Sequence, residues 1–363
     1  MQKEIGSNFD LSPEFDLDTR QMLTPSLFGI NGEQFSFVST GRSAQKLVLE
    51  TICDHCNCDR LVALIPPFTC ETVITPFVQC GFKIFAYSVD DHLCINLESF
   101  RKQLYETGAK VVLVHRYFGF DTLEGLQSII DEFSPRGVIF IEDKTQCLYS
   151  DHKEIFCDFV VSSLRKWGPV PDGGFAVSNK WTLCSFSAGN DTKLEQLKIE
   201  ASRSKYAYLH EGKGEKQAFL DLYRQAEAVL DAEDTYYQIS PASIAIQQQM
   251  DISQLKTKRR ENYAYLYKKL ENISSLRIVM PKLSIGDVPL YFVMSTEQRE
   301  ELQTHLRLNQ IYAPIVWPKA KECPIVCSEV QELYDTVLCL PIDQRYYLDD
   351  MERMAQCIID FLK

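Results

Sequence analysis

The sequence predicts an α/β protein in which a mostly parallel sheet is covered by helices. One observation is that short apolar runs alternate with stretches of helical spacing through about 140 residues, beginning near Phe35. A second is that the apolar runs are bounded by turn residues, as buried strands are. Open sheets of this kind bind ligands beyond the carboxyl ends of their strands, so we expect functional residues there.

The first expected helix begins in a stretch of small hydroxyl residues. The apolar run 35–38 leads into residues 39–44, Ser-Thr-Gly-Arg-Ser-Ala, and Leu47, Val48 and Ile52 then recur at helical spacing. Hydroxyl side chains are favoured at helix N-caps, so this turn predicts a helix that follows a strand.

The later elements are expected on the same two patterns. Further strands are expected at residues 61–65, 82–87, 111–115, 138–141, 159–161 and 175–177. Helices are expected at residues 71–80, 96–106 and 123–133, through most of 185–250, and at 254–273 and 349–362. Two last strands are expected near residues 290–294 and 313–317.

The length of the chain predicts two domains, because 363 residues exceed the usual size of one hydrophobic core. We expect a large domain at residues 1–250, in which residues 1–30 form a polar N-terminal arm. A small α+β domain is expected at residues 251–363.

The composition is that of a soluble globular protein, with 45% hydrophobic and 24% charged residues. A net charge of −12 argues against nucleic acid or an anionic membrane as partner. No stretch approaches the roughly 20 apolar residues of a membrane span, and the first residues lack a signal peptide's apolar core. Thirteen cysteines without such a signal predict reduced thiols and a cytoplasmic location.

A lysine and a carboxylate stand at the ends of two successive expected strands. Lys166 follows the strand at 159–161, and Asp143 follows the strand at 138–141. Pyridoxal 5'-phosphate (PLP) needs a lysine for its Schiff base, a carboxylate for its ring nitrogen and a helix N-terminus for its phosphate. The turn at 39–44 supplies the third part. From the residues alone, a solvated lysine, a loop carboxylate and an ordinary helix cap remain the alternative.

Six stretches together resemble the DegT/StrS-type (DegT/DnrJ/StrS) aminotransferases, in the family's order and across roughly residues 35–350. They are residues 39–44, 65–73, 114–119, 140–146, 158–174 and 340–346. The resemblance implies the aspartate-aminotransferase fold (fold type I of PLP-dependent transferases) and PLP as the cofactor. Many members of the family act on nucleotide-linked keto-sugars.

By position, the resemblance also implies roles for individual residues. Lys166 would form the Schiff base, Asp143 would pair with the ring nitrogen, and Gln146 would reach the phenolic oxygen of the ring. The phosphate would be held by four residues, the first two chiefly through their backbone amides: Gly41, Arg42, Ser43 and Ser163.

The chain departs from the family at three places. Cys70 stands where an aromatic residue commonly stacks on the cofactor ring, and Ser163 is only three residues before Lys166. The loop at 235–238 reads Thr-Tyr-Tyr-Gln, where the family offers an asparagine to the neighbouring subunit's phosphate. We therefore expect a homodimer with composite active sites, in which Tyr236 or a neighbour replaces that asparagine.

The activity that the resemblance implies is transfer of an amino group, with glutamate as the expected donor and a keto-sugar, expected to be nucleotide-linked, as acceptor. Two alternatives stay open. One is a PLP-dependent lyase or dehydratase acting on a sugar, although the family's dehydratase branch replaces the lysine that is present here as Lys166. The other is a PLP-binding regulatory relative without turnover.

Other candidates are weaker. His115 ends an expected strand and Trp317 lies in the small domain, so both are candidates for contact with substrate, and a core role is the alternative for each. The stretch 53–58, Cys-Asp-His-Cys-Asn-Cys, suggests zinc, but no second ligand pair stands near it in the sequence, so we expect no metal.

Overall fold

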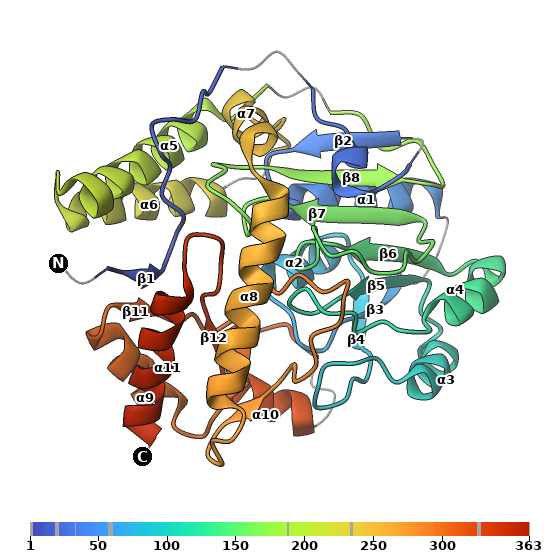
Figure 1. Ribbon diagram of the computed structural model, residues 1–363. Helices are drawn as coiled ribbons and strands as arrows, with labels where there is room; N and C mark the ends of the chain where they lie inside the picture. Colours follow the sequence, from blue (N-terminus) through green and yellow to red (C-terminus); the bar gives the residue numbers. More distant parts are fainter. Residues whose placement is uncertain are drawn as a thin grey trace. The chain divides into compact units, whose positions relative to one another are not determined.

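The structure is a computed structural model (Figure 1). It describes residues 3–18, 22–32, 34–56, 61–186, 189–232, 235–324 and 328–362. Its central feature is a seven-stranded sheet with the order β2-β8-β7-β6-β5-β3-β4. These strands are β2 (Gln34–Val38), β3 (Val62–Ile65), β4 (Lys83–Ala86), β5 (Val111–His115), β6 (Ile139–Asp143), β7 (Phe159–Ser163) and β8 (Gly174–Ser178).

The pairing within the sheet confirms the expected α/β class. Strand β3 pairs in parallel with both β4 and β5, and β5 pairs in parallel with β6. Strand β2 is antiparallel to β8 and lies at one edge of the sheet. Strands β5 and β6 are buried at every position, which is why each reads as an unbroken apolar run up to its polar end.

Four helices alternate with the strands as the sequence predicts: α1 (Gly41–His55), α2 (Glu71–Gln79), α3 (Leu97–Thr107) and α4 (Gln127–Phe133). Helix α3 is capped at both ends, since the side chain of Asn96 accepts the amide of Ser99 and Gly108 adopts a left-handed φ of 63°. Helix α4 begins four residues later than expected because Gly125, at a φ of 81°, belongs to the turn that precedes it.

The chain divides into two compact units. Unit 1 comprises residues 1–7, 52–160 and 252–363, and unit 2 comprises residues 8–51 and 161–251.

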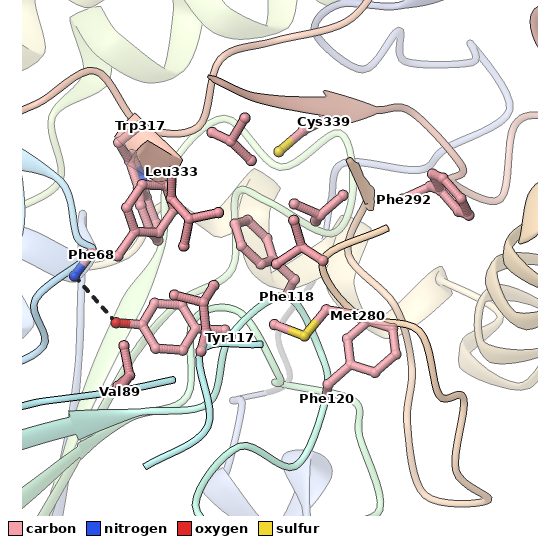
Figure 2. Close-up of a cluster of buried hydrophobic side chains, with 14 of the residues drawn as sticks. Phe68, Val89, Tyr117, Phe118, Phe120, Met280, Phe292, Trp317, Leu333 and Cys339 are labelled. Atoms are coloured by element: carbon pink, nitrogen blue, oxygen red, sulfur yellow. Dashed lines mark hydrogen bonds between the residues drawn. The ribbon is translucent and has the colours of Figure 1, made fainter. Parts of the chain in front are cut away.

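Many apolar side chains of unit 1 form one large cluster of buried residues. Figure 2 shows its aromatic part, in which the ring centroid of Trp317 lies 5.5 Å from that of Phe68 and 5.9 Å from that of Phe118. The hydroxyl of Tyr117 accepts the backbone amide of Phe68 at 3.3 Å, so the polar tip of a fully buried ring is satisfied.

The part of unit 1 after residue 251 contains two long helices, α8 (Ile252–Leu270) and α11 (Leu348–Leu362). Both were expected, and α11 buries Met351, Met354, Ala355 and Ile358 on one face at the spacing of an amphipathic helix. The remaining elements here are β9 (Arg277–Ile278), β10 (Phe292–Ser295), α9 (Arg299–Leu308), β11 (Ile311–Tyr312), α10 (Ser328–Thr336) and β12 (Val337–Leu340).

One expected strand in this part is wrong. Residues 313–317 are irregular, and the strand β11 ends at Tyr312 and pairs with β1 (Ile5–Gly6) instead. Pro314 has no amide hydrogen to donate to a strand partner, although its carbonyl accepts the amide of Cys339.

Unit 2 is largely helical after β8, as the sequence predicts for residues 185–250. It contains α5 (Thr192–Tyr206), a π-helical turn η3 (Ala207–Glu211), α6 (Lys216–Asp231) and α7 (Pro241–Gln249). Helices α5 and α6 pack through a small cluster of Leu194, Ala226 and Leu230. In the part of the chain that the structure describes, no helix is long and apolar enough to cross a membrane.

Candidate cofactor site

Lys166 lies in the turn that follows β7, in unit 2, as predicted. Its side chain is half-buried, and its amine forms no hydrogen bond or ion pair with any residue that the structure describes. The neighbouring Arg165 is instead paired, with its guanidinium 3.7 Å from the carboxylate of Glu227. The lysine amine is therefore available to a carbonyl compound.

The N-terminus of α1 lies in the same unit. The amide of Ser43 donates to Thr40 Oγ1 at 3.0 Å, and the amide of Ala44 donates to the carbonyl of Thr40 at 3.0 Å. The amides of Gly41 and Arg42 have no acceptor among the described residues. Two free amides at the N-terminus of a 15-residue helix form a site for an anion such as a phosphate.

Close packing brings Ser163 to this helix start. A Cβ added at Gly41 would lie 2.9 Å from the Cβ of Ser163, closer than real Cβ atoms approach. The sequence therefore needs glycine at position 41, and Ser163 lies beside the free amides. The guanidinium of Arg42 turns elsewhere, with Nη1 3.4 Å from the carbonyl of Leu230. The side chain of Arg42 therefore leaves its backbone amide as the group that can face a ligand at this helix start.

Tyr236 packs on its own chain. Its hydroxyl donates to Glu50 Oε2 at 2.5 Å, and the Lys46 ammonium lies 5.3 Å from its ring centroid. The amide of Gln238 donates to the carbonyl of Gly189. This loop is therefore ordered against α1 and residue 189 within unit 2.

In unit 1, Asp143 and His115 end neighbouring strands in register. Both side chains are buried, and Asp143 Oδ1 accepts the amide of Thr145 at 2.8 Å. Gln146 is also buried, and its Oε1 accepts the amide of Phe118 at 3.0 Å. The Nε2 of Gln146 has no acceptor among the described residues and is thus the group that can donate to a ligand oxygen.

The ring of His115 is enclosed by aromatic side chains. Its centroid lies 4.4 Å from that of Tyr117 and 6.1 Å from that of Trp317. Burial lowers the pKa of His115 to about 3, so the imidazole is neutral at physiological pH. Its Nε2 has no hydrogen-bond partner among the described residues. Trp317 thereby packs in the core beside a candidate site residue.

Cys70 precedes α2 and is half-buried, with its Sγ 2.9 Å from Thr72 Oγ1. Beside it, Thr69 is fully buried and its hydroxyl has no partner in the described part of the chain. A buried hydroxyl without a partner is costly, so Thr69 Oγ1 is a candidate for contact with a ligand.

The stretch at 53–58 contains thiols that influence one another. Burial raises the pKa of the Cys53 thiol to about 11, and the neighbouring Cys80 and Cys56 add to this effect. Asn57 and Cys58 lie outside the described residues. Across the described ranges, no three His, Cys, Asp or Glu side chains are grouped as a metal site would need.

Two groups of residues were missed by the sequence reasoning. Arg116 and Glu142 form a buried ion pair, each adjacent in sequence to a predicted site residue, and Arg116 Nε also donates to Asp121 Oδ1 at 2.9 Å. Asp172, in the glycine-rich turn after Lys166, is fully buried. In the sequence, Arg116 and Glu142 are marked only by standing next to His115 and Asp143, and Asp172 only by its place in the turn after Lys166. Sequence spacing does not reveal buried polar partners.

Comparison with known proteins supports the fold. The sequence matches no protein-family model and no curated protein. Among solved structures, PseC from Helicobacter pylori, an aminotransferase involved in the biosynthesis of pseudoaminic acid, superposes with a TM-score of 0.72 at 13% identity, covering 99% of each chain.

Two further structures agree. A DegT DnrJ EryC1 StrS aminotransferase from Brucella abortus superposes with a TM-score of 0.64 at 17% identity, covering 91% of this chain and 86% of its own. The GDP-4-keto-6-deoxy-D-mannose-3-dehydratase of E. coli, with bound hydrated PLP, gives 0.65 at 14% identity, with 92% and 89% covered. The chain therefore has the fold of these enzymes, as the resemblance implied.

Proposed function

We propose that this protein is a PLP-dependent aminotransferase of the DegT/StrS type. The observation that carries the proposal is that unit 2 contains both the Lys166 amine and the amides of Gly41 and Arg42, none of which has a hydrogen-bond partner among the described residues. PLP presents an aldehyde and a phosphate, which fit an amine and a helix N-terminus respectively. The shared fold with sugar aminotransferases supports the same reading.

The residues that would hold PLP are those that the resemblance implies. The amides of Gly41 and Arg42, with the hydroxyls of Ser43 and Ser163, would bind the phosphate, and Cys70 would take the place beside the ring. When bound, PLP supplies an electron sink for the carbon that carries the amino group.

The chain's own groups would move and hold protons. The Asp143 carboxylate would hold a proton on the ring nitrogen of the cofactor, and Gln146 Nε2 would donate to its phenolic oxygen. With the cofactor bound, the amine of Lys166 would be the group that accepts a proton from the carbon of the amino donor and donates it again. Because Asp143 is buried, water would screen its charge interaction with the ring only weakly.

The substrates are proposed to be glutamate as amino donor and a keto-sugar, linked to a nucleotide, as acceptor. His115, Tyr236 and Trp317 are proposed to contact substrate. This chemistry serves the biosynthesis of polysaccharides from activated sugars, in the cytoplasm, without a nucleic-acid or membrane partner and without a metal.

The assembly is proposed to be a homodimer with composite active sites. The functional division of each chain is proposed as a large PLP-binding domain at residues 1–250, including the arm 1–30, and a small domain at 251–363.

The test starts from the purified protein mixed with PLP. We expect an absorbance band of the bound cofactor, its loss in Lys166→Ala, and its retention in Lys180→Ala, which removes an exposed lysine of the same unit. Addition of glutamate should then shift the band, and a panel of nucleotide-linked keto-sugars should reverse the shift for the true acceptor.

Each alternative predicts a different result. A dehydratase would consume a keto-sugar, but no amino group from glutamate would appear on the sugar. A regulatory relative would bind PLP and leave every substrate unchanged. An absent band, or one that survives in Lys166→Ala, would contradict the assignment of the lysine.

A further inference from the structure

Asp172 is a buried carboxylate in the turn that follows Lys166. It is fully buried, and among the described residues it has no cationic partner and accepts hydrogen bonds only from serines. The amide of Ser240 donates to its Oδ2 at 3.1 Å, and the hydroxyl of Ser240 donates to its Oδ1 at 2.8 Å. The hydroxyl of Ser243 donates to Oδ1 as well. A buried carboxylate that is satisfied in this way fixes the position of its turn.

The serines belong to the start of α7. Ser240 is the N-cap of this helix, and its Oγ accepts the amide of Ser243 at 3.2 Å. The amide of Asp172 donates back to Ser243 Oγ at 3.2 Å. The turn and the helix start are therefore joined in both directions, and a negative charge at a helix N-terminus is favourable.

The two glycines after Asp172 contact the segment that leads into α1. The amide of Gly173 donates to the carbonyl of Ser39 at 2.5 Å, and its φ of 119° is one that other residues rarely adopt. A Cβ added at Gly174 would lie 2.5 Å from the carbonyl carbon of Thr40 and 2.7 Å from the nitrogen of Gly41. The turn after Lys166 thus lies directly against the proposed phosphate site.

We propose that Asp172 is a positioning residue that fastens this turn to α7, and thereby holds Gly173 and Gly174 against the start of α1. The inference rests on the proposed function, because it gives the anchored segments the task of presenting Lys166 and the amides of Gly41 and Arg42 to one cofactor. Asp172 acts through these neighbours and does not itself contact the cofactor.

The surroundings of Asp172 are consistent with an ionised anchor near neutral pH. Burial raises the pKa of Asp172 to about 6, and the serine donors oppose that rise. The other charged group that faces it is Glu195 of α5, whose Oε1 accepts the amide of Ala242 at 3.2 Å.

The experiment compares four variants by PLP titration followed by absorbance, and by hydrogen exchange of the cofactor-free protein. We expect Asp172→Ala to raise the dissociation constant for PLP about tenfold or more and to speed exchange of the Gly173 amide. Asp172→Asn should keep most of the affinity for PLP and most of the slow exchange at Gly173, since the amide oxygen still accepts from Ser240. Ser240→Ala should give a smaller loss, and Ser202→Ala, which removes a buried hydroxyl elsewhere in unit 2, should give none.

Two results would overturn the inference. One is an unchanged dissociation constant and unchanged exchange in Asp172→Ala. The other is an equal loss in Asp172→Asn and Asp172→Ala, which would assign the effect to charge and not to position. If Asp172→Ala does not fold, Ser240→Ala decides, because it keeps the Ser240 amide contact. If the wild type binds no PLP, the proposed function is wrong. Hydrogen exchange at Gly173 then still tests whether Asp172 holds this turn in place.

Discussion

His115 and Asp143 lie opposite each other, each at the last position of its strand, in the parallel pair β5 and β6. Residues opposite each other in a sheet point to the same face, so an imidazole and a carboxylate share one edge and one face of unit 1. The residues immediately before them, Val114 and Glu142, also lie opposite each other. The register of two strands thus determines which polar groups can reach a common ligand.

The first prediction concerns Asp143. We expect Asp143→Asn to keep PLP bound while amino transfer falls by about two orders of magnitude or more, because an amide does not hold the proton on the ring nitrogen. Absorbance of bound PLP and single-turnover rates with glutamate would measure the two effects separately. Asp131→Asn, an exposed carboxylate of unit 1, is the control. Near-normal transfer in Asp143→Asn would mean that the ring nitrogen is paired elsewhere.

The second prediction concerns the pH dependence of stability. Because the pKa of His115 is lowered to about 3 in the folded protein, the unfolded chain takes up this proton first as pH falls below about 6.5. The contribution of neutral, buried His115 to the free energy of unfolding is therefore complete above about pH 6.5 and is lost as pH falls below it. Between pH 7.5 and pH 5, the wild type should lose about 2 kcal/mol more free energy of unfolding than His115→Phe.

Urea unfolding at the two pH values measures this difference. The comparison uses the change with pH in each protein, so a general loss of stability in His115→Phe does not affect it. Parallel pH dependences in the two proteins would show that His115 is not buried in its neutral form.

The third prediction concerns the buried ion pair behind the site. Glu142→Ala leaves the Arg116 guanidinium with only Asp121 as its carboxylate partner, and should lower the free energy of unfolding by about 3–5 kcal/mol. Asp151→Ala removes the partner of Lys256 from an exposed pair and should cost much less. Equal losses in the two variants, measured by urea unfolding, would contradict a structural role for the buried pair.

The fourth prediction concerns assembly. If active sites are composite, mixing Lys166→Ala with a variant disrupted at residues 236–238 should restore up to about half of the wild-type activity per mixed dimer, because one of its two sites is intact. Light scattering should first give the mass of a dimer. Absence of rescue after proven subunit exchange would show that the loop, which packs on Glu50 and Lys46 of its own chain, serves its own site.

The centre of the sheet could be predicted from the sequence because β5, β6 and β8 are buried at every position and read as apolar runs. Strand β5 begins and ends at the predicted residues, and β6 extends two residues beyond the prediction, through Glu142 and Asp143. Apolar periodicity cannot mark such an extension, since the added residues are charged. The irregular stretch at 313–317 was mistaken for a strand for the converse reason, because its apolar residues fill a core without forming a ladder.

The candidate site could be predicted as a set of positions but not as a set of contacts. Lys166, Gly41 and Asp143 were found because their types and order match a known chemistry. The anchoring serines at 240 and 243 lie about 70 residues from Asp172 in the chain, and only the fold brings them together. Buried polar pairing depends on long-range contacts that sequence spacing does not encode.

Unit 1 is built from three separate segments of the chain, and this affects when it can fold during synthesis. Strand β1, at Ile5–Gly6, pairs with β11 at Ile311–Tyr312, so β1 has no strand partner in β11 until residue 312 has been made. Unit 2 has all of its residues once translation passes residue 251, whereas unit 1 still lacks its third segment. Unit 1 therefore cannot close its core during most of elongation, and its early segment at 52–160 must stay protected from aggregation until that segment is made.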